Sequence, residues 1–126
     1  MARVLVIEDN PINLELVVYL LRAMGHEALT AMDGDAGIAA ARLHKPDLIL
    51  CDIQMPGTDG YGVARVLKAD AELAGIPLVA VTALAMVGDR EKSLQAGFDD
   101  HMSKPIDARA LMAAVTHFLQ PGSTRS

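Results

Sequence analysis

The residues best suited to chemistry stand where apolar runs end. Asp52 closes the run Asp47-Leu-Ile-Leu-Cys-Asp52, and Glu8 and Asp9 directly follow the run at 3–7. Three carboxylates gathered at one place would repel one another and raise each other's pKa values unless positive charge were supplied. Oxygen ligands that leave positions open for water and phosphate suit Mg²⁺. The pattern therefore predicts a magnesium site built around a reactive aspartate.

Two further run ends carry groups that complement such a site. Thr82 ends the run 78–81 with a hydroxyl donor, and Lys104 follows a short run around Met102. A lysine supplies a compact positive charge, which we expect to pair with Asp52 at rest and with an anionic oxygen after reaction. A carboxylate nucleophile in these surroundings suits attack on phosphorus, which needs positioning and charge neutralisation but no general base. We expect Asp52 to form an acyl phosphate.

The elements that must position these groups are predicted from apolar runs rich in Val, Ile and Leu. Such near-continuous runs are typical of parallel strands covered by helices on both faces. The predicted strands are 3–7, 27–31, 47–51, 77–81 and 100–103.

Residues that typically begin and end helices lie between the predicted strands. Asn10 is expected to cap a helix that begins at Pro11 and ends before Gly25. Its expected buried stripe is formed by Ile12, Leu16, Leu20 and Met24. The other expected helices are 34–44, 60–68 after a cap at Asp59, 86–96, and a last helix after Asp107 whose apolar face includes Leu111, Met112, Val115, Phe118 and Leu119. This alternation predicts an α/β fold with a doubly wound parallel sheet, whose strand carboxyl ends form one edge.

Composition narrows the possible partners and location. A chain of 126 residues fits one domain, and a net charge of −5 with four aromatic residues disfavours direct nucleic-acid binding. The single Cys51, expected in the core, excludes an intrachain disulfide and fits a reducing compartment. No stretch is apolar for long enough to span a membrane, so we expect a cytoplasmic protein. Residues 121–126 read as a polar tail or the start of a linker.

Four motifs carry a family resemblance. They are Glu8-Asp9-Asn10, Asp52-Ile-Gln-Met-Pro-Gly57, Val81-Thr82-Ala83 and Ser103-Lys104-Pro105. In order and spacing the chain resembles the CheY-like receiver domain of two-component response regulators over residues 2–120. In detail it resembles single-domain cell-cycle regulators and the receivers of hybrid histidine kinases. The resemblance implies a (βα)5 flavodoxin-like fold with strand order 2-1-3-4-5, and a receiver domain over 1–120.

The resemblance also implies the metal site and the phosphorelay. Asp52 would be the phospho-acceptor, and a histidine kinase or a histidine phosphotransfer protein would donate the phosphoryl group. Asp9 and Asp52 would bind Mg²⁺ directly, Glu8 through water, and Gln54 through its backbone carbonyl. The domain would be a switch with at most self-catalysed phosphorylation and dephosphorylation.

The family's switch implies further roles. Thr82 and Lys104 would contact the phosphoryl group, with a cis Lys104-Pro105 peptide. The switch position three residues before the lysine holds His101 in place of the usual Tyr or Phe, so we hypothesise weakened or pH-dependent coupling. The face changed by the switch would be the fourth helix, fifth strand and fifth helix, where a downstream protein binds. The domain would be a monomer or a weak phosphorylation-dependent dimer.

The same residues allow two other functional interpretations. A small hydrolase with an aspartyl-phosphate intermediate, of haloacid-dehalogenase-like chemistry, would need a second Asp where this chain has Gln54, and a cap segment. A flavodoxin-like nucleotide binder would need a phosphate loop in place of the acidic edge. Sustained turnover of a phosphate ester would distinguish the hydrolase from the switch.

Overall fold

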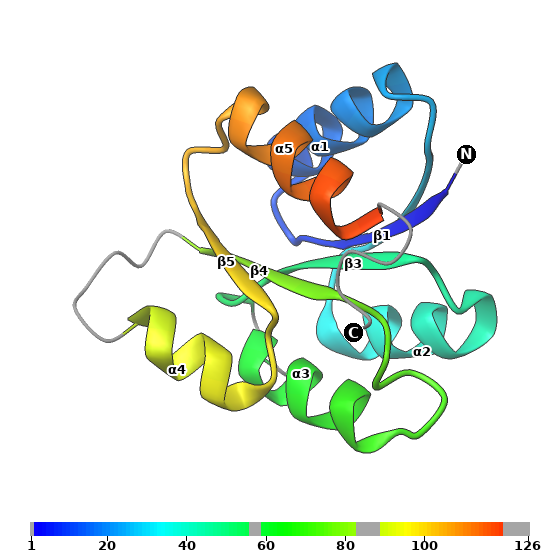
Figure 1. The fold of residues 1–126 in the computed structure, drawn as a ribbon, viewed down its shortest axis with the longest axis vertical. Coiled ribbons are helices and arrows are strands. Elements are labelled where there is room, and N and C mark those ends of the chain that lie inside the picture. The colour runs from blue at the N-terminus through cyan, green and yellow to red at the C-terminus, as the bar shows by residue number, and fades with distance from the viewer. Residues whose placement is uncertain (1, 56–58, 83–88, 120–126) are drawn as a thin grey trace.

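A computed structural model describes residues 2–55, 59–82 and 89–119 of the chain. Strands and helices alternate through these ranges (Figure 1). The strands are β1 (Arg3–Ile7), β2 (Glu27–Ala31), β3 (Leu48–Asp52), β4 (Leu78–Thr82) and β5 (Asp100–Ser103). The helices are α1 (Pro11–Ala23), α2 (Gly34–His44), α3 (Gly60–Ala69), α4 (Asp89–Ala96) and α5 (Ala108–Leu119).

The strands form one parallel sheet in the order β2-β1-β3-β4-β5. This order confirms the predicted doubly wound fold. Helices α1 and α5 cover one face, and α2, α3 and α4 cover the other (Figure 1). Asp52 pairs with Val81 and Thr82 pairs with Ser103 in register, so the polar ends of β3, β4 and β5 come to the same edge of the sheet.

The core forms two aliphatic layers because side chains alternate across each buried strand. Leu5 and Ile7 pack toward α2 and α3, whereas Val4 and Val6 pack toward α1 and α5. Cys51 lies fully buried in the α2 and α3 layer, as expected for a small core residue.

Side-chain caps begin the helices at the expected residues. Asn10 Oδ1 accepts hydrogen bonds from the amides of Ile12 at 2.9 Å and Asn13 at 3.2 Å. Asp59 Oδ1 accepts from Gly62 N at 2.9 Å, and Asp107 Oδ1 accepts from Arg109 N at 3.1 Å. These bonds satisfy amides that the first helical turn leaves unpaired.

The expected buried face of α1 was wrong in part. Ile12 is 76% exposed and Leu16 is 41% exposed, whereas Val17 and Leu21 are buried against the sheet. Residues spaced by four drift around a helix by about 40° per step, so they do not keep one face over three turns. In α5, Met112 is likewise exposed, while Leu111, Val115 and Phe118 are buried.

Parts of some predictions lie outside the described residues. These are the turn at 56–58, the beginning of the helix expected at 86–96, and the tail at 121–126. Across the described ranges, the helices are too short or too polar to cross a membrane.

Candidate functional site

Three carboxylates meet at the carboxyl edge of the sheet. One oxygen from each of Glu8, Asp9 and Asp52 lies within 4.8 Å of the others. Glu8 and Asp52 are each only 3% exposed, and Asp9 is half-buried. Adjacency of β1 and β3 in the sheet produces this cluster, because Glu8 and Asp9 follow one strand and Asp52 ends the other.

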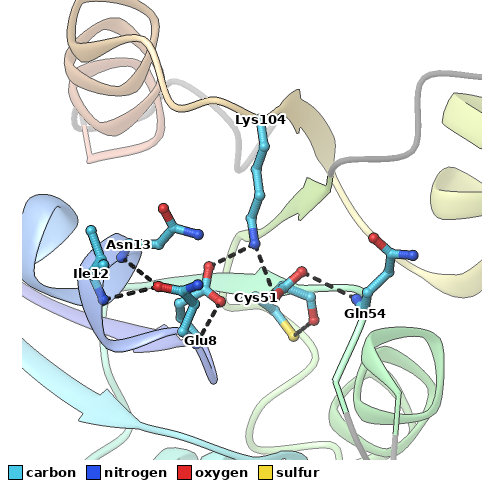
Figure 2. Close-up of polar contacts among 8 residues, drawn as sticks. Glu8, Ile12, Asn13, Cys51, Gln54 and Lys104 are labelled. Carbon is cyan, nitrogen blue, oxygen red and sulfur yellow. Dashed lines mark hydrogen bonds and ion pairs between the residues drawn. The ribbon is translucent and has the colours of Figure 1, made fainter.

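Lys104 joins the two buried carboxylates. Its Nζ lies 3.0 Å from Glu8 Oε1 and 3.1 Å from Asp52 Oδ2 (Figure 2). Burial lowers the pKa of Lys104, but the hydrogen bonds to Glu8 and Asp52 outweigh that effect and raise the pKa overall. The lysine is therefore a fixed positive charge at the centre of the site.

Glu8 is the carboxyl group most affected by its surroundings. Burial and the neighbouring Asp52 raise the pKa of Glu8 to about 7, although Lys104 and the amide of Asn10 oppose the shift. Two buried carboxylates share one ammonium group, so positive charge is in short supply. A divalent cation would supply it, and the all-oxygen donor set fits Mg²⁺.

Backbone groups fix the direction of the acidic side chains. Gln54 N donates to Asp52 Oδ1 at 3.1 Å, and Asn10 N donates to Glu8 Oε2 at 3.1 Å. Gly60 N donates to Ile53 O at 2.8 Å, which ties the start of α3 to the backbone next to Asp52. These bonds hold one oxygen of Asp52 and one oxygen of Glu8 in defined positions.

Thr82 ends β4, the strand next to that of Asp52, and His101 lies on β5, one strand further out. Thr82 is fully buried at the end of β4. His101 pairs in register with Ala80, so its side chain shares a sheet face with Ala80 and Thr82, the face covered by α3 and α4. The Nε2 atom of His101 is buried without a hydrogen-bond partner.

The predicted resting pair of Lys104 with Asp52 is confirmed, and the structure adds a pair that sequence reasoning missed. The bond from Lys104 to Glu8 was not predicted. The sequence did contain a clue to this bond, since Glu8 directly follows β1, the strand next to that of Asp52. The Lys104-Pro105 peptide is cis, as the resemblance implied.

Cys51 takes no part in the acidic cluster. Its Sγ donates to the carbonyl of Asp52 at 3.3 Å, and burial raises the pKa of the thiol. A thiol held protonated in this way is a poor nucleophile. The described structure therefore leaves Asp52 as the better-placed nucleophile of the two neighbours.

Comparison with known sequences identifies relatives over almost the whole chain. The family described as "Response regulator receiver domain" matches residues 4–116. The polar-differentiation response regulator DivK of Brucella anthropi is 41% identical over 116 residues, which cover 92% of this chain and 94% of that protein. DivK of Brucella ovis has the same identity and coverage.

Solved structures share the fold. The signal receiver domain of a signal transduction histidine kinase from Syntrophus aciditrophicus has a TM-score of 0.89 and 32% identity, covering 100% of this chain and 95% of that one. The receiver domain of sensor histidine kinase PA1611 from Pseudomonas aeruginosa PAO1 has a TM-score of 0.86 and 33% identity, covering 93% and 96%. That second structure holds a magnesium ion in its active site cleft.

Proposed function

The chain belongs to the response regulator receiver domain family, and from that premise we propose that Asp52 accepts a phosphoryl group from a phosphohistidine donor. The observation that carries this proposal is the position of the Asp52 carboxylate. It lies at the end of β3, 3.1 Å from Lys104 Nζ and beside the acidic pair Glu8 and Asp9. We assign the activity to residues 1–120 as one receiver unit in the cytoplasm.

The transfer is a displacement at phosphorus. A carboxylate oxygen of Asp52 attacks the phosphorus atom, the bond from phosphorus to the donor imidazole nitrogen breaks, and an acyl phosphate remains. The nucleophile is already an anion, so no base has to remove a proton. Lys104 Nζ touches the attacking group and is free to follow the negative charge onto a phosphoryl oxygen. We assign the Thr82 hydroxyl to a second phosphoryl oxygen.

The cofactor proposed for this step is Mg²⁺. Asp9 and Asp52 would hold it directly, Glu8 through water, and Gln54 through its backbone carbonyl. Bound there, it would neutralise charge that develops on the phosphoryl oxygens. The support is the gathering of Glu8, Asp9 and Asp52 and the raised pKa of Glu8, together with the magnesium ion recorded in the PA1611 receiver.

The output surface proposed here is formed by α4, β5 and α5, which lie around the β5 edge of the sheet (Figure 1). Leu94 on α4 and Met112 on α5 are apolar side chains that are each about two-fifths exposed. Movement of Thr82 toward the phosphoryl group would free space for His101, whose unpartnered Nε2 would then find a different environment. A downstream protein would recognise the altered surface, and the domain would act as a monomer or weak dimer.

The docking surface proposed for the donor is an apolar groove on α1. The groove encloses about 660 Å³ and is lined in part by Ile12, Leu16 and Tyr19, all well exposed. The first turn of α1 borders the acidic site, as Ile12 and Asn13 lie beside Glu8 in Figure 2. A histidine donor carried on a helical bundle could pack a helix in this groove while its imidazole reaches Asp52.

The proposal is tested by labelling the protein from a small-molecule donor such as acetyl phosphate. Wild-type protein with Mg²⁺ should gain one phosphoryl group that hydroxylamine removes, and Asp52→Asn should gain none. Asp35→Asn, which changes an exposed aspartate on α2, is the matched control and should label normally. Persistent labelling of Asp52→Asn, or many-fold steady turnover of a phosphate ester, would contradict the switch assignment.

A further inference from the structure

Tyr61 lies in the first turn of α3, next to the backbone that carries Asp52. It follows Gly60, whose amide donates to Ile53 O at 2.8 Å. A Cβ atom at position 60 would lie 2.5 Å from Ile53 Cα and 2.7 Å from the carbonyl oxygen of Asp52. The first turn of α3 is thus in direct contact with the backbone of the proposed acceptor, and any shift of that backbone reaches Tyr61.

The ring of Tyr61 reaches in the other direction, to α4 and the residues after it. The ring is 7% exposed. Lys92 Nζ of α4 lies 4.8 Å from the ring centroid, and the Phe98 ring meets it edge-on, with centroids 6.5 Å apart and planes at 74°. Both arrangements are attractive, the first between a cation and a π face and the second between an aromatic edge and face.

The described part of α4 buries few large side chains of its own. Among residues 91–96, those buried are the small Ser93 and Ala96, and Leu94 points outward. A helix with so small an apolar face gains little from packing of its own side chains. Tyr61 belongs to the core cluster that also holds Ala96 of α4, and its ring lies under Lys92, so it is one of the large apolar groups next to the described part of α4.

The hydroxyl group of Tyr61 makes its contact with α4 less favourable. The hydroxyl oxygen of Tyr61 is buried and has no hydrogen-bond partner. A buried hydroxyl without a partner is unfavourable, and displacement of α4 that admits water would relieve it. The attraction of Lys92 and Phe98 to the Tyr61 ring favours the present position of α4, whereas the unsatisfied hydroxyl favours its displacement. The position of α4 is therefore sensitive to small changes in the backbone next to Tyr61.

We propose that Tyr61 is a positioning residue that transmits the state of Asp52 to α4, alongside Thr82 and His101. The inference rests on the proposed function, since it names a second connection from the same site to the output surface. The connection runs from the backbone at Asp52 and Ile53 through Gly60 to the Tyr61 ring and then to Lys92. It needs no contact made by the switch residue on β5.

The test is hydrogen exchange of the α4 amides, with and without beryllofluoride and Mg²⁺ as a phosphoryl mimic. Tyr61→Phe keeps the ring and removes the unsatisfied hydroxyl, so exchange in resting protein should slow by about fivefold, the effect of losing one modest unfavourable term. The response of α4 to the mimic should shrink in the same variant. Lys92→Met removes the cation and should speed exchange.

Lys45→Met is the matched control, because it makes the same chemical change as Lys92→Met at an exposed lysine after α2 and should alter neither readout. Fluorine NMR of the bound mimic reports loading separately. Wild-type protein that does not load would contradict the proposed function. Normal loading, with α4 exchange and its response equal in wild type, Tyr61→Phe and Lys92→Met, would overturn the role of Tyr61.

Discussion

The charge balance of the site is decided by three side chains. Lys104 contacts both Glu8 and Asp52, and one ammonium group cannot neutralise two carboxylates. Burial and the neighbouring Asp52 raise the pKa of Glu8 to about 7, so this carboxyl group retains a proton up to near neutral pH. A site arranged in this way is poised to take up a cation, because binding would relieve repulsion that folding created.

Glu8 gives the metal-free protein a specific pH dependence. Its pKa is about 7 when folded against an ordinary value of 4.5, so the folded state holds the extra proton between these values. The free energy of unfolding should therefore fall as pH rises through this window, and the Glu8 contribution should level off above it. Denaturant unfolding in a chelator checks this, by comparing wild type with Glu8→Gln.

The Glu8→Gln variant should lose that part of the slope, since its side chain stays neutral throughout. Glu15→Gln, on the exposed surface of α1, should keep the wild-type slope. Equal slopes for all three proteins would contradict the raised pKa. In wild type, Mg²⁺ affinity should increase with pH over the same window, because the ionised carboxylate favours the cation.

At the scale of elements, strands were easier to predict than helix faces. β1 and β2 begin and end as expected, and β3 and β4 are displaced by one residue. Strands buried on both faces need only apolar runs, which the sequence displays directly. Helix α1 carries apolar residues on most sides, so its pattern does not select Val17 and Leu21 over Ile12 and Leu16.

In the candidate site, too, some features follow from the sequence and others depend on packing. Placement of Asp52, Thr82 and Lys104 at one edge follows from strand ends in an alternating α/β chain. The bond from Lys104 to Glu8 depends on which strands are neighbours and on side-chain direction. Contacts made across α3 and α4 by Tyr61 depend on helix packing, which periodicity alone does not determine.

The exposed face of α1 yields a prediction about donor choice. Leu16→Arg places a charge in the groove without disturbing the core, because Leu16 is 41% exposed. Phosphoryl transfer from a histidine kinase should slow by about tenfold, as expected for an interface residue that packs against a partner. Labelling from acetyl phosphate should keep its wild-type rate, since that donor needs no docking surface.

Leu43→Arg is the control for this experiment. It makes the same change at an exposed leucine on α2, away from α1, and should leave both transfer rates unaltered. The docking assignment would be wrong if Leu16→Arg accepted phosphoryl groups from the kinase as fast as wild type does. It would also be wrong if both donors slowed equally.

At the scale of the whole molecule, the fold separates the surface proposed for the donor from the surface proposed for the downstream protein. Helix α1, whose residues line the groove, lies over one face of the sheet, and α4 lies over the other (Figure 1). Asp52 stands between them at the end of the central strand β3. A donor on α1 could therefore depart while a downstream protein binds near α4, with the state of Asp52 as the common link.

The most direct test of Asp52 as the phospho-acceptor is to locate the phosphoryl group chemically. Phosphorylated protein is reduced with borohydride, which converts an aspartyl phosphate to homoserine, and peptide mass spectrometry then identifies the modified position. We predict homoserine at position 52, dependent on Mg²⁺ and on the donor. Homoserine at another aspartate, or stable phosphorylation with an unmodified Asp52, would contradict the central claim.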